Sequence, residues 1–443
     1  MNHAGTREQS RPLLPGPVTT ALVQLERVLA VWVPYIPMIA VFSYILFWPV
    51  TFPPPGKTHI QVQNDGELSR QLSLGFSFAI AALVMFSQRG RLSAFLWNNK
   101  LLLLLLLWAL LSVSWSAVPV LSFKRWIQFA GFLLVARVAV IGEHGPERTL
   151  AVLRTLFALA VFASLAMVLL NPEAGLDASR QAWRGIHVHK NTLGQVATFA
   201  AVLWLPALLT ATGPLRKGVV TAVISVALLL VLQSDSKSSQ IVLAVLLGIW
   251  LWLALPFRRE IKFAIAPLPL LVTLFWLFAL HSGGVTDLFF AAIERDSSLT
   301  GRTLLWQELL DQFGLHSLYG AGYNGFWTSL NPQARLLVLR IGWDPGQAHN
   351  GYLDVLNELG IIGAGIFLLL LLQMSVRIVR SMRVHLVVGQ TLLLLFVSQV
   401  LFNITETGFC RGSTLGWILF LTTAILANRL GHWKEVKAGA AHA

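Results

Sequence analysis

Apolar segments long enough to cross a membrane recur along this chain, and they constrain its fold more than any other feature. Residues Leu101 to Leu107 are seven consecutive leucines, and the apolar stretch continues to Val113. Hydrocarbon about 30 Å thick requires roughly 20 apolar residues per helical span. Only 12% of the 443 residues are charged, which is about half the fraction found in soluble domains. The sequence therefore predicts an all-α integral membrane protein with about twelve transmembrane helices.

The predicted spans divide the chain into tails, helices and one long loop. They lie near residues 28–50, 71–87, 100–115, 122–141, 149–170, 191–211, 218–232, 240–256, 263–281, 351–373, 384–402 and 413–427. Basic residues concentrate in the short loops on one side, which the positive-inside rule makes cytoplasmic. The resulting division is a cytoplasmic tail over 1–27, helices one to nine within 28–281, a long outward loop with surface helices over 282–350, helices ten to twelve within 351–427, and a cytoplasmic tail over 428–443.

Charge and cysteine content exclude two other interpretations of the chain. The formal net charge is +13, but the cations lie in short loops between spans, so we expect no nucleic-acid partner. Cys410 is the single cysteine, which excludes an internal disulfide. Residues 1–27 lack the apolar core of a cleaved signal peptide, so we predict that they remain as a tail.

Several cations lie on the predicted outward side, where the positive-inside rule expects few. Those just before the sixth span are Arg184, His187, His189 and Lys190. Such residues either anchor a protein at lipid headgroups or form a pocket for a phosphate-bearing substrate. Asn191 then begins a helix whose N-terminus faces outward and favours an anion. The two histidines have no third ligand at a telling spacing, and neighbouring cations would repel a metal ion, so we expect no metal.

The long outward loop contains two further motifs. Arg302 lies near the start of a predicted surface helix that has Leu305, Leu309 and Phe313 on one face. A cation is unusual there because the helix dipole favours anions, which makes Arg302 a candidate ligand-binding residue. Residues 320–325 match the dinucleotide fingerprint literally, but no strand-turn-helix unit surrounds them, so we interpret them as a glycine turn.

A polar stripe follows His349 into the tenth predicted span. Its members, at helical spacing on one face, are Asn350, Asp354, Asn357 and Glu358. Ionisable groups within a bilayer are costly and usually have partners, and we expect Arg137 or Arg154 to serve. His349, at the outer mouth of the stripe, is either a solvated interfacial histidine or a general base. We predict the base, because histidine exchanges protons at neutral pH.

Together these residues resemble the O-antigen ligase and Wzy-type polysaccharide polymerase superfamily, in particular its exopolysaccharide-polymerase members. The resemblance rests on His349-Asn350 followed after nine residues by Gly360-x-x-Gly363. Residues 183–191, residues 299–302 and Thr405-Glu406 are also similar. The similarity covers roughly residues 100–430, and the combination of motifs is more specific than any one of them.

The resemblance implies a multi-span (GT-C-like), inverting, metal-independent glycosyltransferase of the bacterial inner membrane, with cytoplasmic termini and a periplasmic active site. The donor would be a glycan on undecaprenyl diphosphate, and no cofactor is implied. The acceptor would be another lipid-linked glycan, lipid A core or a protein hydroxyl. Membrane lipids and other polysaccharide-assembly proteins are further expected partners. The implied site residues are His349 as the base, Arg184, Arg302, Lys190 and His189 at the diphosphate, and Asn191, Asn350, Asp354, Glu358 and Glu406 as supporting polar groups.

The sequence does not distinguish a polysaccharide polymerase from an O-antigen ligase. Two other classes of function also stay open. In a transporter or flippase of a lipid-linked or anionic solute, the polar stripe would line the pathway. The chain lacks the paired interrupted spans and half-to-half similarity of many transporters, so we favour the transferase. In a membrane scaffold for a polysaccharide machine, the outward loop would carry no chemistry.

Overall fold

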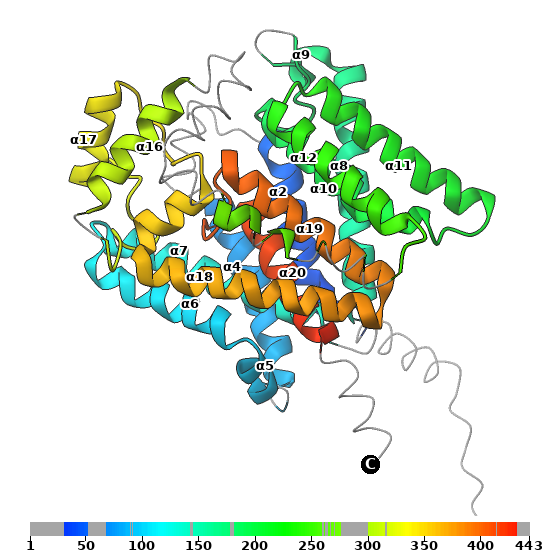
Figure 1. Cartoon of the computed structure of the whole chain (residues 1–443), viewed down its shortest axis with the longest axis horizontal. Coiled ribbons are helices and arrows are strands. Elements are labelled where there is room, and N and C mark those ends of the chain that lie inside the picture. Colours follow the sequence, from blue (N-terminus) through cyan, green and yellow to red (C-terminus); the bar gives the residue numbers. More distant parts are fainter. Residues whose placement is uncertain are drawn as a thin grey trace, which may run out of the picture.

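Helices dominate the part of the chain that the structure describes (Figure 1). The computed structural model describes residues 31–51, 68–88, 90, 92–141, 145–177, 181–258, 261, 265, 267–269, 271–275, 300–314, 317–412 and 414–431. Outside helices, these residues form an isolated antiparallel bridge between Leu176 and Trp183. The prediction of an all-α chain is thus confirmed for the described residues.

Most of the described helices form a bundle, and three others lie near one end of it (Figure 1). The bundle contains α2 (Ile36–Thr51), α4 (Leu68–Ser87), α5 (Leu92–Asn98), α6 (Lys100–Leu111), α7 (Pro119–Ala139), α8 (Gly145–Leu170), α10 (Lys190–Leu208), α11 (Pro214–Gln233), α12 (Lys237–Ala254), α18 (Gly351–Val384), α19 (Leu386–Thr405) and α20 (Leu415–Gly431). The three helices near the end of the bundle are α9 (Pro172–Gly175), α16 (Thr300–Phe313) and α17 (Pro332–Ile341).

Six described helices are long and apolar enough to cross a membrane: α8, α10, α11, α12, α18 and α19. The bent pair α4 and α5 would make a seventh, while α2, α6 and α20 are shorter apolar helices. The protein is therefore a multi-span membrane protein. Helices overlap the predicted spans wherever the structure describes them, but most of 263–281 lies outside the described residues. The total of twelve stays a prediction.

The helix α18 is broken at Gly360, where φ is +68° and ψ is −173°. The break removes the helical hydrogen bonds of the last carbonyls before Gly360, and amides of the glycine turn at 320–325 replace them. The amides of Ala321 and Gly322 each donate to one of the last carbonyls before the break at 2.9 Å, and Trp108 Nε1 donates to Leu359 O at 2.9 Å. Irregular backbone at membrane depth is tolerated where protein groups satisfy it in this way.

This break corrects the predicted tenth span, 351–373. Residues 351–359 form a separate helical piece bound to the glycine turn, and the unbroken piece runs over 361–384. The sequence motif Gly360-x-x-Gly363 favoured close helix contact, which holds at Gly363, where an added Cβ would lie 3.0 Å from the Trp108 ring. The prediction of a glycine turn at 320–325 is confirmed, because Gly320 and Gly322 both have positive φ.

We expect Gly360→Ala to destabilise the protein by about 3 kcal/mol, because its backbone conformation is nearly exclusive to glycine. An added Cβ would also overlap the Leu318 carbonyl. In the same helix, a Cβ at Gly365 would meet nothing within 4 Å, so Gly365→Ala should be neutral or slightly stabilising. Thermal unfolding of the purified protein in detergent measures both. Equal melting temperatures for the two variants would show that the break does not depend on glycine.

The helix predicted near residue 302 is confirmed as α16, and its position on the membrane surface stays a prediction. Leu305 and Leu309 are buried, and Trp306 Nε1 donates to Ala348 O at 2.8 Å. This bond ties α16 to the segment immediately before α18. Arg302 and His349 are therefore carried by two segments that are fixed to each other.

Candidate active site

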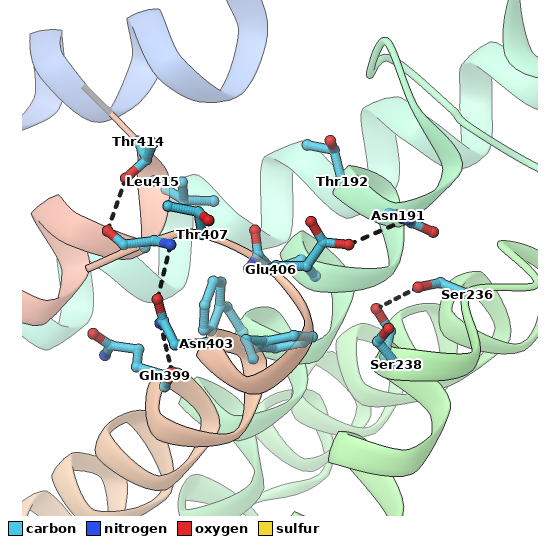
Figure 2. A pocket seen from close by; sticks show the side chains of 16 residues that line it. Asn191, Thr192, Ser236, Ser238, Gln399, Asn403, Glu406, Thr407, Thr414 and Leu415 are labelled. Carbon is cyan, nitrogen blue, oxygen red and sulfur yellow. Dashed lines mark hydrogen bonds between the residues drawn. The ribbon is translucent and has the colours of Figure 1, made fainter. Parts of the chain in front are cut away.

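Four segments that are distant in the sequence meet at Glu406, directly after α19. Asn191 Nδ2 donates to Glu406 Oε1 at 3.4 Å (Figure 2), and Arg302 Nη2 lies 3.7 Å from the same oxygen. His349 Nδ1 lies 3.8 Å from Glu406 Oε2. The Glu406 side chain is 25% exposed, so it is accessible from outside the bundle. We call these four residues the Glu406 cluster.

The turn that carries Glu406 is fixed by Asn403 in the last part of α19. Asn403 Oδ1 accepts the amides of Gly408 and Phe409, each at 2.8 Å (Figure 2 shows the first of these bonds). An added Cβ at Gly351 would overlap the Asn403 side chain. The first residue of α18 therefore packs directly on this turn, which brings the start of α18 to the end of α19.

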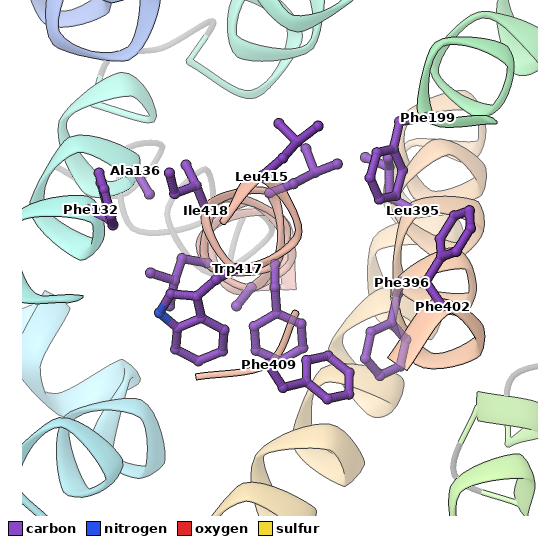
Figure 3. Close-up of a cluster of buried hydrophobic side chains, with 14 of the residues drawn as sticks. Phe132, Ala136, Phe199, Leu395, Phe396, Phe402, Phe409, Leu415, Trp417 and Ile418 are labelled. Atoms are coloured by element: carbon purple, nitrogen blue, oxygen red, sulfur yellow. The ribbon is translucent and has the colours of Figure 1, made fainter. Parts of the chain in front are cut away.

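A buried aromatic core supports the same turn from below. Figure 3 shows α20 between Phe132 of α7 and Phe396 of α19, with Trp417 and Phe409 beside it. The Trp417 side chain is fully buried, and Phe409 is nearly so. Close packing of large rings resists displacement. The chain between α19 and α20 is therefore held in place by this core.

The backbone before His349 is anchored by a buried carboxylate. The Ala348 amide lies 3.3 Å from both oxygens of Asp354, consistent with a shared hydrogen bond. Arg411 Nη1 lies 3.7 Å from Asp354, and Arg411 Nη2 donates to Gly346 O at 2.7 Å. His349 itself has φ of +51°, a conformation that needs such support.

The imidazole of His349 is held through one of its two nitrogens. Gln347 Nε2 lies 3.2 Å from Nδ1, and Glu406 lies on the same nitrogen at 3.8 Å. Gln347 Nε2 can only donate, so as placed it makes Nδ1 an acceptor, whereas the carboxylate favours a proton on Nδ1. With the Gln347 amide turned so that its oxygen faces the ring, Nδ1 carries the proton and Nε2 is left as the acceptor. The His349 side chain is 20% exposed.

Arg302 is 9% exposed and is bound to the end of α19. Its Nη1 donates to Thr405 O at 2.6 Å, while Nη2 faces Glu406. A guanidinium has five N–H donors in a planar fork, so donors beyond these contacts can bind a second anion. Phosphate oxygens are suited to that geometry.

The other predicted diphosphate ligands lie at or before the start of α10. His189 is the N-cap residue of α10, and Lys190 Nζ lies 3.5 Å from Asp235 Oδ2. Arg184 Nε donates to Ala174 O at 3.0 Å. Among the described contacts, none joins Arg184 to the Glu406 cluster, so a diphosphate site shared by Arg184 and Arg302 stays a prediction.

His187 corrects the predicted group of cations in this segment. Its side chain is buried, and neither ring nitrogen has a hydrogen-bond partner among the described residues. Burial lowers the pKa of His187 to about 4, so the ring is neutral at pH 7. The sequence could not show this, because it does not reveal which loop residues are buried.

We expect acid to destabilise the protein through His187. The unfolded chain has a histidine pKa of about 6.5, so the contribution is complete above that pH and is lost as the pH falls toward 4. The loss should approach about 3 kcal/mol. His187→Leu should flatten this part of the profile, as measured by thermal unfolding between pH 7 and pH 4. An identical acid loss in wild type and variant would contradict the assignment.

The polar stripe of α18 holds the start of that helix and the segment 317–350 before it. Asn350 caps α18 and accepts the Leu353 amide at 3.1 Å. Glu358 Oε2 accepts the Asn324 amide at 2.9 Å, and Asp354 holds the segment before His349, as described above. The break at residue 360 ends this piece of α18, which the helical spacing alone could not predict.

The predicted cationic partners of this stripe are wrong for the described residues. Arg137 lies over the Phe95 ring at 5.2 Å from its centroid, and Arg154 Nε donates to a carbonyl of α10 at 2.8 Å. The cation at Asp354 is Arg411. Sequence reasoning missed Arg411 because it lies in the turn after α19, 57 residues beyond Asp354.

A cavity of about 140 Å³ opens beside Glu406 (Figure 2). Its walls come from α10, α12, α19 and the turn before α20. Polar lining residues include Asn191, Thr192, Ser236, Ser238, Asn403 and Glu406. Amide and hydroxyl groups of this kind suit a ligand with many hydroxyls, and Glu406 in the wall is the residue that lies 3.8 Å from His349.

Comparison with known proteins supports the sequence resemblance. A family model described as O-antigen ligase matches residues 220–368. Over 298 residues, the chain is 28% identical to the exopolysaccharide production protein ExoQ of Rhizobium meliloti (strain 1021). Both matches are similarities, one to an O-antigen ligase domain and one to an exopolysaccharide production protein, and they agree with the superfamily that the sequence motifs resemble. The alignment covers 62% of this chain and 63% of the relative, so it spans less than two thirds of that protein.

The apolar helices indicate a multi-pass membrane protein, and residues 220–368 of it are similar to an O-antigen ligase domain. The region matching the O-antigen ligase model contains Arg302 and His349, whereas Asn191 and Glu406 lie outside it. The three-dimensional structure is therefore what joins the matched and unmatched parts into one cluster.

Proposed function

We propose that this protein is an inverting glycosyltransferase of the bacterial inner membrane that polymerises repeat units of a surface or exopolysaccharide. Its donor is a glycan on undecaprenyl diphosphate, and its acceptor is a hydroxyl of another lipid-linked glycan at the periplasmic face. The proposal includes twelve spans, cytoplasmic termini, the long loop between the ninth and tenth spans, and no metal or cofactor. The observation that carries it is the Glu406 cluster, which joins a histidine, a carboxylate and a buried arginine.

The chemistry follows from the positions of these groups. His349 Nε2 accepts the proton of the acceptor hydroxyl while the oxygen attacks the anomeric carbon of the donor. The bond from that carbon to the diphosphate oxygen breaks, and its electron pair leaves with the diphosphate. Free donors of Arg302 stabilise the charge that develops there. Glu406 stabilises the imidazolium formed on His349, since it faces Nδ1.

The structure also bears on the transporter alternative. Asp354 and Glu358, which would line a polar pathway through the membrane, are bonded to the outer loop. Their role in holding the site favours a transferase. Lipid-linked donor that crosses a reconstituted bilayer without any glycosidic bond being formed would favour the flippase instead.

An O-antigen ligase is the second candidate, because the matching family model carries that description. The name of the relative from Rhizobium meliloti refers to exopolysaccharide production, which favours the polymerase. Deleting the gene and analysing both polymers separates the two. Loss of long secreted polymer with normal lipopolysaccharide supports the polymerase. Core-only lipopolysaccharide with accumulated lipid-linked polymer supports the ligase, and unchanged polymers of both kinds contradict both.

A further inference from the structure

A second cavity, of about 390 Å³, lies between α18 and the junction of α5 with α6. Arg377 in its wall lies 17 residues beyond the break at Gly360. At 1.5 Å per residue, that separation is about 25 Å, close to the thickness of the hydrocarbon layer. The cavity therefore lies about one hydrocarbon thickness along α18 from the break, on the side away from the start of α18 and the Glu406 cluster.

Three cations line this cavity, and its described lining contains no carboxylate. The complete lining is Trp97, Asn98, Lys100, Gln373, Val376, Arg377 and Arg380. Lys100 Nζ lies 3.0 Å from the centroid of the Trp97 ring, and Arg377 donates to the Asn98 carbonyl. These neutral partners orient the two cations without cancelling their charge. The cavity is therefore a site for an anion.

Gln373 adds a second requirement on the ligand. Its Oε1 atom is buried and has no hydrogen-bond partner among the described residues. A buried acceptor of this kind is normally satisfied, and a ligand hydroxyl that displaces the side chains covering it can donate to it. A ligand that meets both requirements carries a phosphate for the cations and a hydroxyl for Gln373. The indole of Trp97 is exposed, as is usual for tryptophan at a membrane interface.

We propose that this cavity binds the headgroup of an anionic phospholipid with free hydroxyls, of the phosphatidylglycerol type. The phosphate lies among Lys100, Arg377 and Arg380, and a glycerol hydroxyl donates to Gln373 Oε1. The acyl chains leave along the lipid-facing side of α18, where Leu369 and Leu372 are exposed. The site is independent of the transferase reaction and would persist if that function were wrong.

The experiment titrates the purified full-length protein in detergent with single lipids and measures bound lipid by native mass spectrometry. Phosphatidylglycerol should bind at least tenfold more tightly than phosphatidylcholine. The double variant Arg377→Gln/Arg380→Gln should lose about thirtyfold in phosphatidylglycerol affinity. Because Arg377 also binds backbone, Arg380→Gln alone is the second variant, and about a fivefold loss is expected.

The matched control is Arg216→Gln/Lys217→Gln at the start of α11, which removes two exposed cations outside the cavity. It should leave the affinity unchanged. Gln373→Leu should reduce phosphatidylglycerol binding to the level of phosphatidic acid, which lacks the glycerol hydroxyls. Equal losses in the two double variants, or no preference over phosphatidylcholine, would overturn the site. Binding of soluble glycerol 3-phosphate as tight as that of the lipid would overturn the lipid assignment.

Discussion

His349→Ala should lower glycan transfer by a factor on the order of 10² to 10⁴, which is the usual contribution of a general base. The protein should still fold and insert, because the described polar contacts of the ring involve Nδ1 alone and its side chain is partly exposed. Polymer synthesis by membranes from a complemented deletion strain measures the first effect. Thermal unfolding in detergent measures the second.

A histidine outside the site serves as the control for this variant. His385 is the N-cap residue of α19, at the other end of that helix from Glu406, and its ring accepts the Val388 amide. His385→Asn keeps a capping acceptor, so both transfer and stability should stay near wild type. Normal polymer from His349→Ala would remove the base from the proposed mechanism.

Hydropathy predicted the long apolar helices, because the apolar side chains that face lipid or other helices lie within each helix's own sequence. His349, Arg302 and Glu406 could also be identified, as polar groups next to those segments and by resemblance. Their meeting could not be derived from the residues alone. It depends on Asn403 turning the chain after α19 and on Gly351 packing against that turn, and both contacts join residues far apart in the sequence.

The break at Gly360 explains why the predicted cationic partners of the polar stripe were wrong. An unbroken helix would place Asp354 and Glu358 within the membrane, where a cation from another span is the natural partner. The positive φ of Gly360 breaks the helix after these residues, and Asp354 meets Trp327 of the segment before α18 and Arg411 of the turn after α19. A glycine spacing is compatible with either geometry, so only the tertiary structure decides between them.

Glu406→Gln should lower transfer by a factor on the order of 10² to 10³, because an amide cannot stabilise the imidazolium on His349 as a carboxylate does. It also leaves the buried charge of Arg302 without its anion, which should reduce stability. Initial rates with purified protein and lipid-linked donor separate kcat from KM. The control is Glu308→Gln, which removes the half-buried partner of the exposed Arg340 at 2.8 Å and should leave transfer unchanged.

A double variant distinguishes the two ways in which Glu406 can act. If Glu406 works through His349, adding Glu406→Gln to His349→Ala should cost little, because residues that act as a unit are strongly non-additive. If Glu406 acts instead by orienting the Arg302 guanidinium toward the diphosphate, the losses of the two single variants should multiply. Glu406 faces Arg302 with Oε1 and His349 with Oε2. Non-additive losses would therefore assign its effect on transfer to the contact of Oε2 with His349. Fully multiplicative losses would leave Glu406 as an arginine partner and contradict its role in orienting the base.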